Sequence, residues 1–507
     1  MHLTQTLHRA AQQEPDRALT VFGDRVRTVA ESAERIARFA GALRALGVRE
    51  GDRVGILALN SDRYHELLLA VPWAGAVVNP VNIRWSPAEI AHSLVDCETK
   101  VLVVDEAFAP LVGPLTERAN CLRIVISCGD GRAGPGLLDY EELIAGNLPL
   151  EDVRFGGDSL FGIFYTGGTT GAPKGVMLSH RAVLTSALGT WSTYDALTRR
   201  GRLLHAAPMF HLADIGAWTV GQLIGSTHVI VPSFTPAGVA EAVAVHAVTD
   251  ILLVPTMIQI LVDAPETAEA DLSSLRQIVY GASPIAPAVL QRARERLPHA
   301  HFTQAYGMTE LAAVSTLLLD SDHEDTSLLT SCGRGAAHCE VRVVDENDVE
   351  LPRGAVGEIV VRGDNVMTGY WNKPTETAAA LRGGWMHTGD AGRMDERGYL
   401  FLADRIKDMI ITGGENVYSF EVENALLEHA AVAQAAVVGA PDRRWGERVH
   451  AFVVLRDGMD VNGDELSRFC SAHIAGYKVP RAYSFVPELP TSAAGKVLKR
   501  ELREALH

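Results

Sequence analysis

The sequence predicts an α/β fold, with a large N-terminal domain of two α/β lobes and a small β module, followed by a smaller α+β C-terminal domain. Three observations support this prediction. Short apolar runs of strand length alternate with segments of helical period up to about Cys332. The pattern then changes to short alternating runs punctuated by glycine. A mixed segment of about 100 residues ends the chain.

The first lobe begins with a helical pattern over residues 29–46 that ends at Gly47, a residue type suited to the position after a helix. Further elements follow at short intervals: strands over 54–59, around 77, over 101–105 and over 123–127, and a helix over 63–73. Strands that alternate with helices imply right-handed crossovers and a largely parallel sheet with both faces covered.

The second lobe, the β module and the C-terminal segment each have their own pattern. In the second lobe we expect strands at 229–231, 251–254 and 277–280. In the β module we expect strands at 341–345 and 358–362. The last segment has strand patterns at 435–438 and 449–455 and helical patterns at 419–428 and 463–473. We therefore predict an N-terminal domain over 1–404 and a C-terminal domain over 405–507, with the boundary near Arg405 to Lys407.

Composition excludes several classes of protein. The 507 residues are 47% hydrophobic and 21% charged, as in ordinary globular proteins, and the formal charge of -16 argues against a nucleic-acid surface. We find neither a secretion signal nor an apolar stretch long enough to span a bilayer. Six scattered cysteines lack ligand spacing, which favours reduced thiols and a cytoplasmic location without integral membrane association.

A glycine- and threonine-rich stretch follows the apolar run 160–165, which reads as a buried strand. Its polar and small residues are Thr166, Gly167, Gly168, Thr169, Thr170 and Gly171, followed by Lys174. Glycines allow consecutive N–H groups to turn inward, hydroxyls add donors, and Lys174 supplies a cation, so this composition suits a phosphate. It is not a Walker A loop, since Lys174 lies between Pro173 and Gly175. The alternative is an ordinary surface turn before a helix capped by Ser179.

Residues 165–175 resemble the signature loop of the adenylate-forming enzymes, the superfamily of acyl-CoA synthetases, luciferases and peptide-synthetase adenylation domains. Further stretches match this superfamily in the expected order, at 281–283, 304–310, 385–390, 404–416 and 490–496, so the resemblance covers essentially the whole chain. It implies that the protein uses ATP, Mg²⁺ and coenzyme A.

The stretch 304–310, Gln-Ala-Tyr-Gly-Met-Thr-Glu, carries groups suited to a nucleotide. Tyr306, followed by Gly307, offers a flat face for a purine, and Thr309 offers a hydroxyl for a phosphate. Glu310 is a hard oxygen ligand of the kind that Mg²⁺ prefers. The resemblance assigns the same roles and adds Thr166 to the metal site. A Thr-Glu cap at a helix start is the alternative.

For two shorter stretches, the resemblance alone implies a role in binding the nucleotide. Gly281, Ala282 and Ser283 follow a strand and correspond to the wall of the adenine pocket; a structural turn is the alternative. Asp390 corresponds to the residue that accepts both ribose hydroxyls, and Arg405 to a second ribose contact.

Lys496 matches the lysine that bridges the carboxylate and the α-phosphate in the first half-reaction. Because this lysine would obstruct the thiol, the resemblance implies that the C-terminal domain pivots about Lys407. The pivot brings the loop containing Gly413 and Gly414 beside the pantetheine of coenzyme A. Thr491 and Ser492 stand where relatives often carry Arg or Asn, so the contacts that flank Lys496 are not implied.

His211 stands where amino-acid-activating relatives carry Asp after an aromatic residue, which argues against an amino-acid substrate. It would act as a gate or position the thiol; a satisfied core histidine is the alternative. The stretches 211–216, 254–258, 281–285 and 308–315 should line the acyl pocket and are apolar, with Asp214 turned away. They predict a neutral, apolar acid.

We therefore expect an ATP-dependent acyl-CoA synthetase of fatty acid metabolism that activates a medium- or long-chain fatty acid. An aryl or alicyclic acid–CoA ligase is the alternative, and so is an acyl-AMP ligase that loads a carrier protein. A luciferase and a catalytically silent nucleotide-binding protein remain as more distant classes. The expected partners are the small carboxylic acid, ATP and coenzyme A, with the chain a monomer or homodimer.

Overall fold

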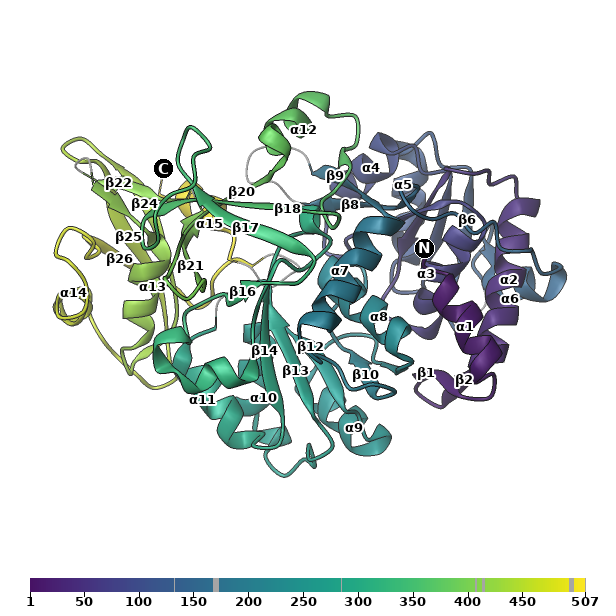
Figure 1. The fold of residues 1–507 in the computed structure, drawn as a ribbon, viewed down its shortest axis with the longest axis horizontal. Helices are drawn as coiled ribbons and strands as arrows, with labels where there is room; N and C mark the ends of the chain where they lie inside the picture. Colours follow the sequence, from purple (N-terminus) through teal and green to yellow (C-terminus); the bar gives the residue numbers. More distant parts are fainter. Residues whose placement is uncertain are drawn as a thin grey trace.

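The computed structural model describes residues 1–131, 133–166, 173–283, 285–405, 408–412, 415–491 and 497–506, without the side chains of residues 404, 405 and 416. The chain forms a mixed α/β structure, as predicted. Its large N-terminal part holds two long sheets and a small antiparallel sheet, and the C-terminal elements gather beside it, at the left of Figure 1.

The first lobe is built on a sheet with the strand order β19-β9-β8-β4-β3-β5-β6-β7. Its strands are β3 (Arg53–Leu57), β4 (Val77–Pro80), β5 (Val101–Val104), β6 (Ile124–Ser127), β7 (Leu138–Asp139), β8 (Leu160–Thr166), β9 (Lys174–Ser179) and β19 (Gly369–Tyr370). From β8 to β7 the neighbours are parallel, as the alternating pattern predicted.

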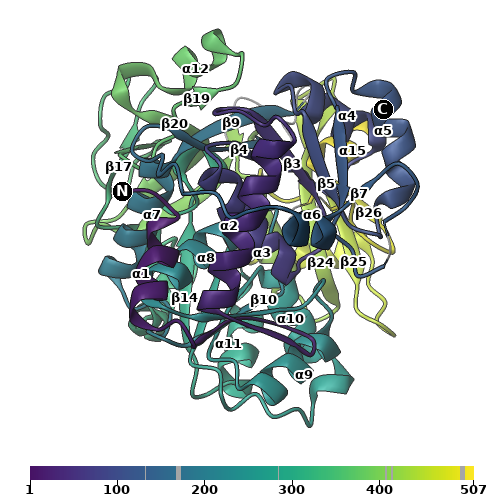
Figure 2. The ribbon, with the colours of Figure 1, turned by 90° about the vertical axis from the view of Figure 1, so that its right-hand side faces the viewer.

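The helices of this lobe are α1 (Gln5–Gln13), α2 (Val29–Ala45), α3 (Asp62–Trp73), α4 (Pro87–Asp96), α5 (Val112–Arg118) and α6 (Tyr140–Gly146). The helix α2 begins with a capping box, in which Thr28 accepts from the Glu31 N–H while the Glu31 carboxylate accepts from the Thr28 N–H. Past its end, Gly47 adopts a φ of 86°, a left-handed conformation that favours glycine. Figure 2 shows α2 in front, with α3 and α6 beside it.

The second lobe has the strand order β16-β15-β14-β13-β12-β10-β11-β1-β2. Its strands are β1 (Ala18–Phe22), β2 (Arg25–Thr28), β10 (Arg202–His205), β11 (Thr227–Ile230), β12 (Asp250–Leu253), β13 (Gln277–Gly281), β14 (His301–Tyr306), β15 (Thr316–Leu318) and β16 (Arg334–Gly335). The associated helices are α7 (His180–Thr193), α8 (Leu212–Ile224), α9 (Pro236–His246), α10 (Pro255–Asp263) and α11 (Pro287–Arg296).

Two features of these sheets were not predicted. The strand β1, from the start of the chain, joins the second sheet beside β11, because the buried side chains of β1 complete the apolar layer there. The segment Lys174–Ser179 is a strand rather than an extension of the loop, and β9 pairs antiparallel with β8. Ser179 then caps α7 as predicted, accepting from the Ala182 N–H at 3.1 Å.

The small β module is an antiparallel sheet of β17 (Cys339–Val344), β18 (Val356–Gly363), β20 (Met386–Met394) and β21 (Leu400–Arg405), with α12 (Pro374–Ala380) nearby. The C-terminal elements are β22 (Ile410–Thr412), β23 (Glu415–Val417), α13 (Ser419–Leu427), β24 (Val432–Asp442), β25 (Gly446–Leu455), α14 (Gly463–Ser471), β26 (Ala482–Phe485) and α15 (Lys499–Glu504). Sheet membership changes between Arg405 and Ile410, and Lys407 lies outside the described residues.

All six cysteines are free thiols. Within the described ranges, every helix is either too short or too polar to cross a bilayer.

Candidate active site

The glycine- and threonine-rich stretch between β8 and β9 is called the phosphate loop below. The strand β9 brings the lysine at the end of this loop, Lys174, against a tyrosine from a distant part of the chain. Thr166, the last residue of β8, pairs with Lys174, the first residue of β9. The strand β19 pairs with β9 on its other edge and carries Tyr370. The Nζ of Lys174 lies 5.1 Å from the centroid of the Tyr370 ring, within the range of a cation–π interaction.

Tyr370 also reaches Glu310. Its hydroxyl donates to Oε1 of Glu310 at 2.8 Å, and Glu310 is only 6% exposed. Burial, and then the adjacent carboxylate of Glu310, raise the pKa of Tyr370, so its hydroxyl remains a donor at neutral pH. Tyr370 therefore joins Lys174 to Glu310 in one cluster.

A second contact joins Tyr306, at the end of β14, to Asp390 on β20. The Tyr306 hydroxyl donates to Oδ2 of Asp390 at 2.8 Å. Burial, and then the Asp390 charge, raise the pKa of Tyr306 well above its ordinary value. The Asp390 N–H in turn donates to Oγ1 of Thr388 at 3.1 Å. The structure thus brings together the residues predicted to hold a purine and a ribose, although 84 positions separate them.

Small residues line the ends of β13 and β14 because the backbones approach closely there. A Cβ on Gly281 would lie 2.1 Å from the carbonyl oxygen of Ala305, and one on Gly307 would lie 2.0 Å from that of Ala313. Ala282 adopts a φ of 66°, which is uncommon for a residue with a side chain. Larger side chains at these glycines would push the strand ends apart.

A cavity of about 170 Å³ opens beside these strand ends and along α8. Five residues predicted to serve the site contribute to its wall: His211, Gly281, Ala282, Gly307 and Thr309. His211 is the N-cap residue of α8. The rest of the wall is mainly apolar, and each of the four stretches expected to line an acyl pocket contributes to it.

Asp214 is one of the residues of the cavity wall, but its carboxyl is directed toward β10. Its Oδ2 lies 2.8 Å from Nδ1 of His205, and His205 is not part of the wall. Both residues are almost fully buried. This contact is in keeping with the expectation that Asp214 turns away from the cavity.

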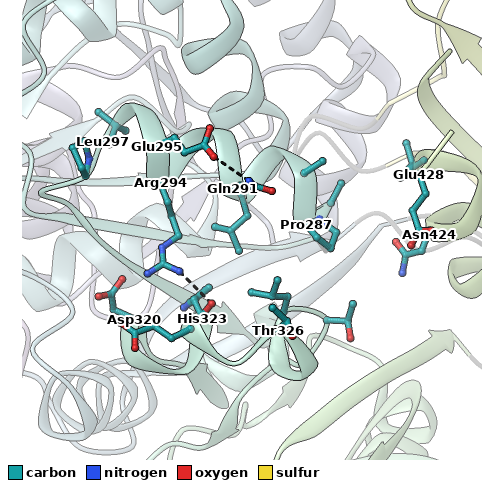
Figure 3. A pocket seen from close by; sticks show the side chains of 18 of the residues that line it. Pro287, Gln291, Arg294, Glu295, Leu297, Asp320, His323, Thr326, Asn424 and Glu428 are labelled. Atoms are coloured by element: carbon teal, nitrogen blue, oxygen red, sulfur yellow. Dashed lines mark hydrogen bonds between the residues drawn. The ribbon is translucent and has the colours of Figure 1, made fainter. Parts of the chain in front are cut away.

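A larger open cleft of about 1100 Å³ lies between α11 and α13 (Figure 3). Arg294 donates to the His323 carbonyl oxygen on one wall, and Asn424 and Glu428 face it from the C-terminal elements. This cleft includes His301 at the start of β14, whereas Tyr306 stands at the other end of that strand. Five strand residues span about 16 Å, so the cleft is separate from the cavity.

The other predicted site residues are only partly described. Ser283 is described but is not among the residues of the cavity wall. Outside the described residues lie Gly167, Gly168, Thr169, Thr170, Gly171, Lys407, Gly413, Gly414 and Lys496, and the Arg405 side chain is likewise not described. Their predicted roles stay predictions.

Sequence reasoning missed Tyr370 and the helix α4. The Tyr165 hydroxyl donates to Oδ2 of Asp96 at 2.6 Å, and Nε2 of His92 lies 3.2 Å from the carbonyl oxygen of Pro173. These contacts connect α4 to both ends of the phosphate loop. An aromatic residue in a Gly-Tyr pair and polar residues in a short helix give no local signal of such a role.

Comparison with known proteins agrees with this arrangement. The family model for the AMP-binding enzyme matches residues 7–371, and that for the AMP-binding enzyme C-terminal domain matches residues 421–496. A feruloyl-CoA synthase from an Amycolatopsis species is 40% identical over 98% of this chain and 97% of its own length. The fatty acid–[acyl-carrier-protein] ligase ScoC of Streptomyces coeruleorubidus is 36% identical over 99% and 96%.

Among solved structures, the anthranilate CoA ligase AuaEII in complex with anthranoyl-AMP superposes with a TM-score of 0.93, at 26% identity, over 100% of this chain and 97% of that one. The enzymes of this family use ATP and coenzyme A. Both family models match, and the predicted nucleotide residues Tyr306 and Asp390 are in contact. The chain therefore belongs to the AMP-binding enzyme family, in the acyl-CoA synthetase branch of the adenylate-forming superfamily, and is an AMP-forming acid–thiol ligase.

Proposed function

We propose that this enzyme activates an aromatic carboxylic acid with ATP and transfers the acyl group to coenzyme A. The observation that carries the proposal is the cavity of about 170 Å³, whose largely apolar wall includes Ala305 and Gly307, the chain neighbours of Tyr306. A closed apolar cavity of about 150 Å³ is known to hold one benzene molecule. The volume here therefore suits one ring with a short side chain, whereas a long alkyl chain needs more space.

From the sequence we expected a fatty acid as the substrate and gave an aryl or alicyclic acid as the alternative. We now prefer the aromatic acid. The 40% identical feruloyl-CoA synthase and the structurally similar anthranilate CoA ligase support an aromatic acid. Apolar residue types alone could not distinguish the two substrates, because both an alkyl chain and a ring bury carbon. The distinction rests on how much space those residues leave.

In the first half-reaction a carboxylate oxygen of the acid attacks the α-phosphorus of ATP, the bond to the bridging oxygen breaks, and pyrophosphate leaves. Lys174 would balance the negative charge on the leaving pyrophosphate, and the hydroxyl of Thr166 would donate to it. Tyr306 and Asp390 would hold the purine and the ribose. Closure of the site around the acyl-AMP product would exclude water and protect it from hydrolysis.

Glu310 would hold Mg²⁺, with Thr166 as a further oxygen ligand, and the cation would neutralise charge on the phosphates. The fit is chemical: a buried carboxylate is a hard ligand, and Mg²⁺ commonly takes one or two carboxylates together with substrate phosphates. Clusters of three or more His, Cys, Asp or Glu side chains able to form a metal cage are absent from the residues that the structure describes.

In the second half-reaction the thiolate sulfur of coenzyme A attacks the acyl carbonyl, a thioester forms, and AMP leaves with the electron pair of the broken anhydride bond. We propose that the two halves of the reaction use two positions of the C-terminal domain, 405–507, related by a pivot at Lys407. Lys496 would serve the first half-reaction, and the Gly413–Gly414 loop would serve the second.

The test is pyrophosphate release measured over a panel of acids, with coenzyme A and a holo acyl carrier protein compared as acceptors. We expect the highest kcat/KM for acids with one aromatic ring and thioester formation with coenzyme A. A maximum at long-chain fatty acids would contradict the aromatic assignment. Acyl transfer to the carrier protein alone would favour the activity of its 36% identical relative ScoC.

The variant Lys496→Ala is the control in this experiment. It should stop pyrophosphate release but still form thioester from supplied acyl-AMP, since only the first half-reaction is assigned to this lysine. Equal loss of both half-reactions would contradict the assignment.

A further inference from the structure

A bulge in the β module carries Asp390, the residue expected to hold the ribose. The strands β18 and β20 are antiparallel neighbours (Figure 1), and their pairing shifts register between Glu358 and Val360. Only Ile359 lies between these two residues on β18, whereas residues 388–390 lie between their partners on β20. The extra residues on β20 form the bulge, a feature that can redirect a side chain beside an active site.

Two side chains hold the bulge by hydrogen bonds to its backbone. Oε1 of Glu358 accepts from the Gly389 N–H at 3.0 Å. The Thr388 hydroxyl accepts from the Asp390 N–H at 3.1 Å and donates to the Ile359 carbonyl oxygen at 2.7 Å. Gly389 has a φ of 71°, a left-handed conformation that favours glycine. The conformation of the bulge therefore depends on the side chains of Glu358 and Thr388.

The carboxylate of Glu358 is itself held in place. Its side chain is only 16% exposed, and its Oε2 accepts from Nη2 of Arg382 at 3.1 Å. Nδ1 of His387 lies 2.9 Å from the same oxygen, and because a carboxylate only accepts, Nδ1 is the donor. These two donors fix the carboxylate, so that its other oxygen meets the Gly389 N–H. A hydrogen bond to an ionised acceptor is roughly twice as strong as one between neutral groups.

The bulge joins the β module to the nucleotide residues of the second lobe. Oδ2 of Asp390 accepts from the Tyr306 hydroxyl at 2.8 Å. Tyr306 is 8% exposed and lies at the end of β14, so that strand and the surrounding packing fix its ring. A change in the conformation of the bulge would therefore move Asp390 relative to Tyr306.

We propose that Glu358 is a positioning residue for ATP: through the Gly389 N–H it holds Asp390 where the Asp390 carboxylate accepts from the ribose hydroxyls, and it thereby favours ATP over deoxynucleotides. The inference rests on the proposed function, because it takes Asp390 to be the ribose contact. Glu358 acts through Gly389 and needs no contact with the nucleotide itself. Hydrogen bonds weaken steeply as their geometry departs from the optimum, so a small displacement of Asp390 is sufficient to weaken the ribose contact.

The experiment compares ATP with 2′-deoxy-ATP and 3′-deoxy-ATP in pyrophosphate release at a saturating concentration of the acid. The measured quantity is kcat/KM for ATP divided by kcat/KM for each deoxynucleotide. The concentration of active enzyme cancels from this ratio, so a partly folded variant can still be compared. We expect a ratio of tenfold or more in the wild type for at least one deoxynucleotide. Ratios within twofold of unity for both would overturn the proposal.

Two variants remove the contact to different degrees. Glu358→Ala should lower the ratio at least fivefold, with the loss for ATP mainly in KM, because a ribose contact serves the ground state and the transition state alike. Glu358→Gln should lower it at least twofold but less than Glu358→Ala: its amide oxygen can still accept from Gly389, while its NH₂ group faces the donor Arg382. This variant also provides the test if the alanine variant does not fold. A wild-type ratio in either variant would overturn the proposal.

Asp348→Asn is the matched control. Oδ1 of Asp348 accepts from Nη2 of Arg382 at 3.1 Å, so this carboxylate binds the same guanidinium as Glu358 but from outside the bulge. Asp348 has a φ of 62°, a conformation that asparagine also tolerates. The ratio in Asp348→Asn should equal that of the wild type. A loss as large as in Glu358→Ala would overturn the proposal, because the charges around Arg382 would then set the ratio.

Asp390→Ala separates a failure of this inference from a failure of the proposed function. Its ratio should fall to about one. If it does so while Glu358→Ala keeps the wild-type ratio, the inference alone is overturned. An unchanged ratio in Asp390→Ala would contradict the assignment of Asp390 to the ribose, and the inference with it. If no acid supports pyrophosphate release, the proposed function fails, and the same ratio taken from dissociation constants, measured by calorimetry, still tests Glu358.

Discussion

At the scale of single residues, Tyr370 is the contact through which the phosphate-loop lysine and the predicted metal ligand come together. Its ring faces Lys174 Nζ and its hydroxyl binds Oε1 of Glu310. The hydroxyl fixes the direction of a carboxylate that is only 6% exposed. A carboxylate held in one orientation is a better-organised ligand than one that rotates.

We expect Tyr370→Phe to lower kcat/KM for pyrophosphate release by about ten- to a hundredfold, because a hydrogen bond to a charged group is worth about 1.5–3 kcal/mol. The loss should be largest at limiting Mg²⁺, which a titration of Mg²⁺ at fixed ATP would measure. Tyr370→Leu also removes the ring beneath Lys174 and should lose more. Wild-type kinetics in Tyr370→Phe would show that the contact has no part in catalysis.

At the scale of secondary-structure elements, α4 supports the phosphate loop from outside. Asp96 at its C-terminal end accepts from the Tyr165 hydroxyl, and the Asp96 carbonyl oxygen accepts from the Trp371 indole N–H at 2.9 Å. His92 lies one turn earlier and contacts the Pro173 carbonyl. The helix thus fixes β8 before the loop, the chain after the loop, and the segment that follows Tyr370.

Removal of one of these contacts should affect ATP more than folding. We expect Tyr165→Phe to raise KM for ATP about three- to tenfold and to lower the free energy of unfolding by about 1–2 kcal/mol. Tyr140→Phe is the matched control, since the Tyr140 hydroxyl donates to Oε2 of buried Glu66 at 2.9 Å away from the loop. It should cost similar stability and leave KM for ATP unchanged. Equal values of KM in both variants would refute the role of α4.

At the scale of the whole molecule, polar groups are buried where the two lobes meet. The helix α3 of the first lobe carries His65, and α8 and β11 of the second carry its neighbours Trp218, Gln222 and His228. These side chains are at most 6% exposed. The hydrogen bonds that satisfy them exist only when the lobes are packed together, so they make the packing specific.

This burial predicts a dependence of stability on pH. Burial lowers the pKa of His65 from 6.5 to about 3, so between these values the unfolded chain binds a proton that the folded chain does not. Stability is therefore full above pH 6.5 and falls as the pH is lowered toward 3. At pH 5 the loss from this one residue is about 2 kcal/mol.

Urea denaturation at pH 7.5 and pH 5 would measure this effect. We expect His65→Gln to lose about 2 kcal/mol less than the wild type between the two values, because the variant has no group to titrate at this position. Buried groups that lie away from His65 contribute equally to both proteins and cancel. Parallel losses in the two proteins would contradict the lowered pKa of His65.

Local patterns in the sequence were sufficient for much of the fold. The period of the apolar residues predicted α2 and α3 to within a few residues, and the predicted cap at Ser179 agrees with the observed start of α7. Local pattern failed at β1, which pairs in the second lobe, and at β9, which returns along β8. Strand pairing depends on partners remote in sequence, which no window of residues contains.

The residues of the candidate site likewise fall into those that the sequence identified and those that only the structure revealed. Tyr306, Glu310 and Lys174 could be named from the chemistry of their motifs, because a nucleotide needs a flat face, an oxygen ligand for the metal and a cation for its phosphates. Asp390 could be named only from the place of its stretch in the order that the family shares. Tyr370 and Asp96 could not, because their roles arise from contacts with residues far away in sequence.

The sequence by itself determined the family, the reaction class and the residue types that serve ATP, because these are written in short contiguous motifs. Only the tertiary structure decided the size of the cavity beside β13 and β14, the contact between Asp214 and His205, and the burial that lowers the pKa of His65. The physical reason is that a cavity is the space left between packed elements, and the proton on a buried group depends on every neighbour that the fold brings to it.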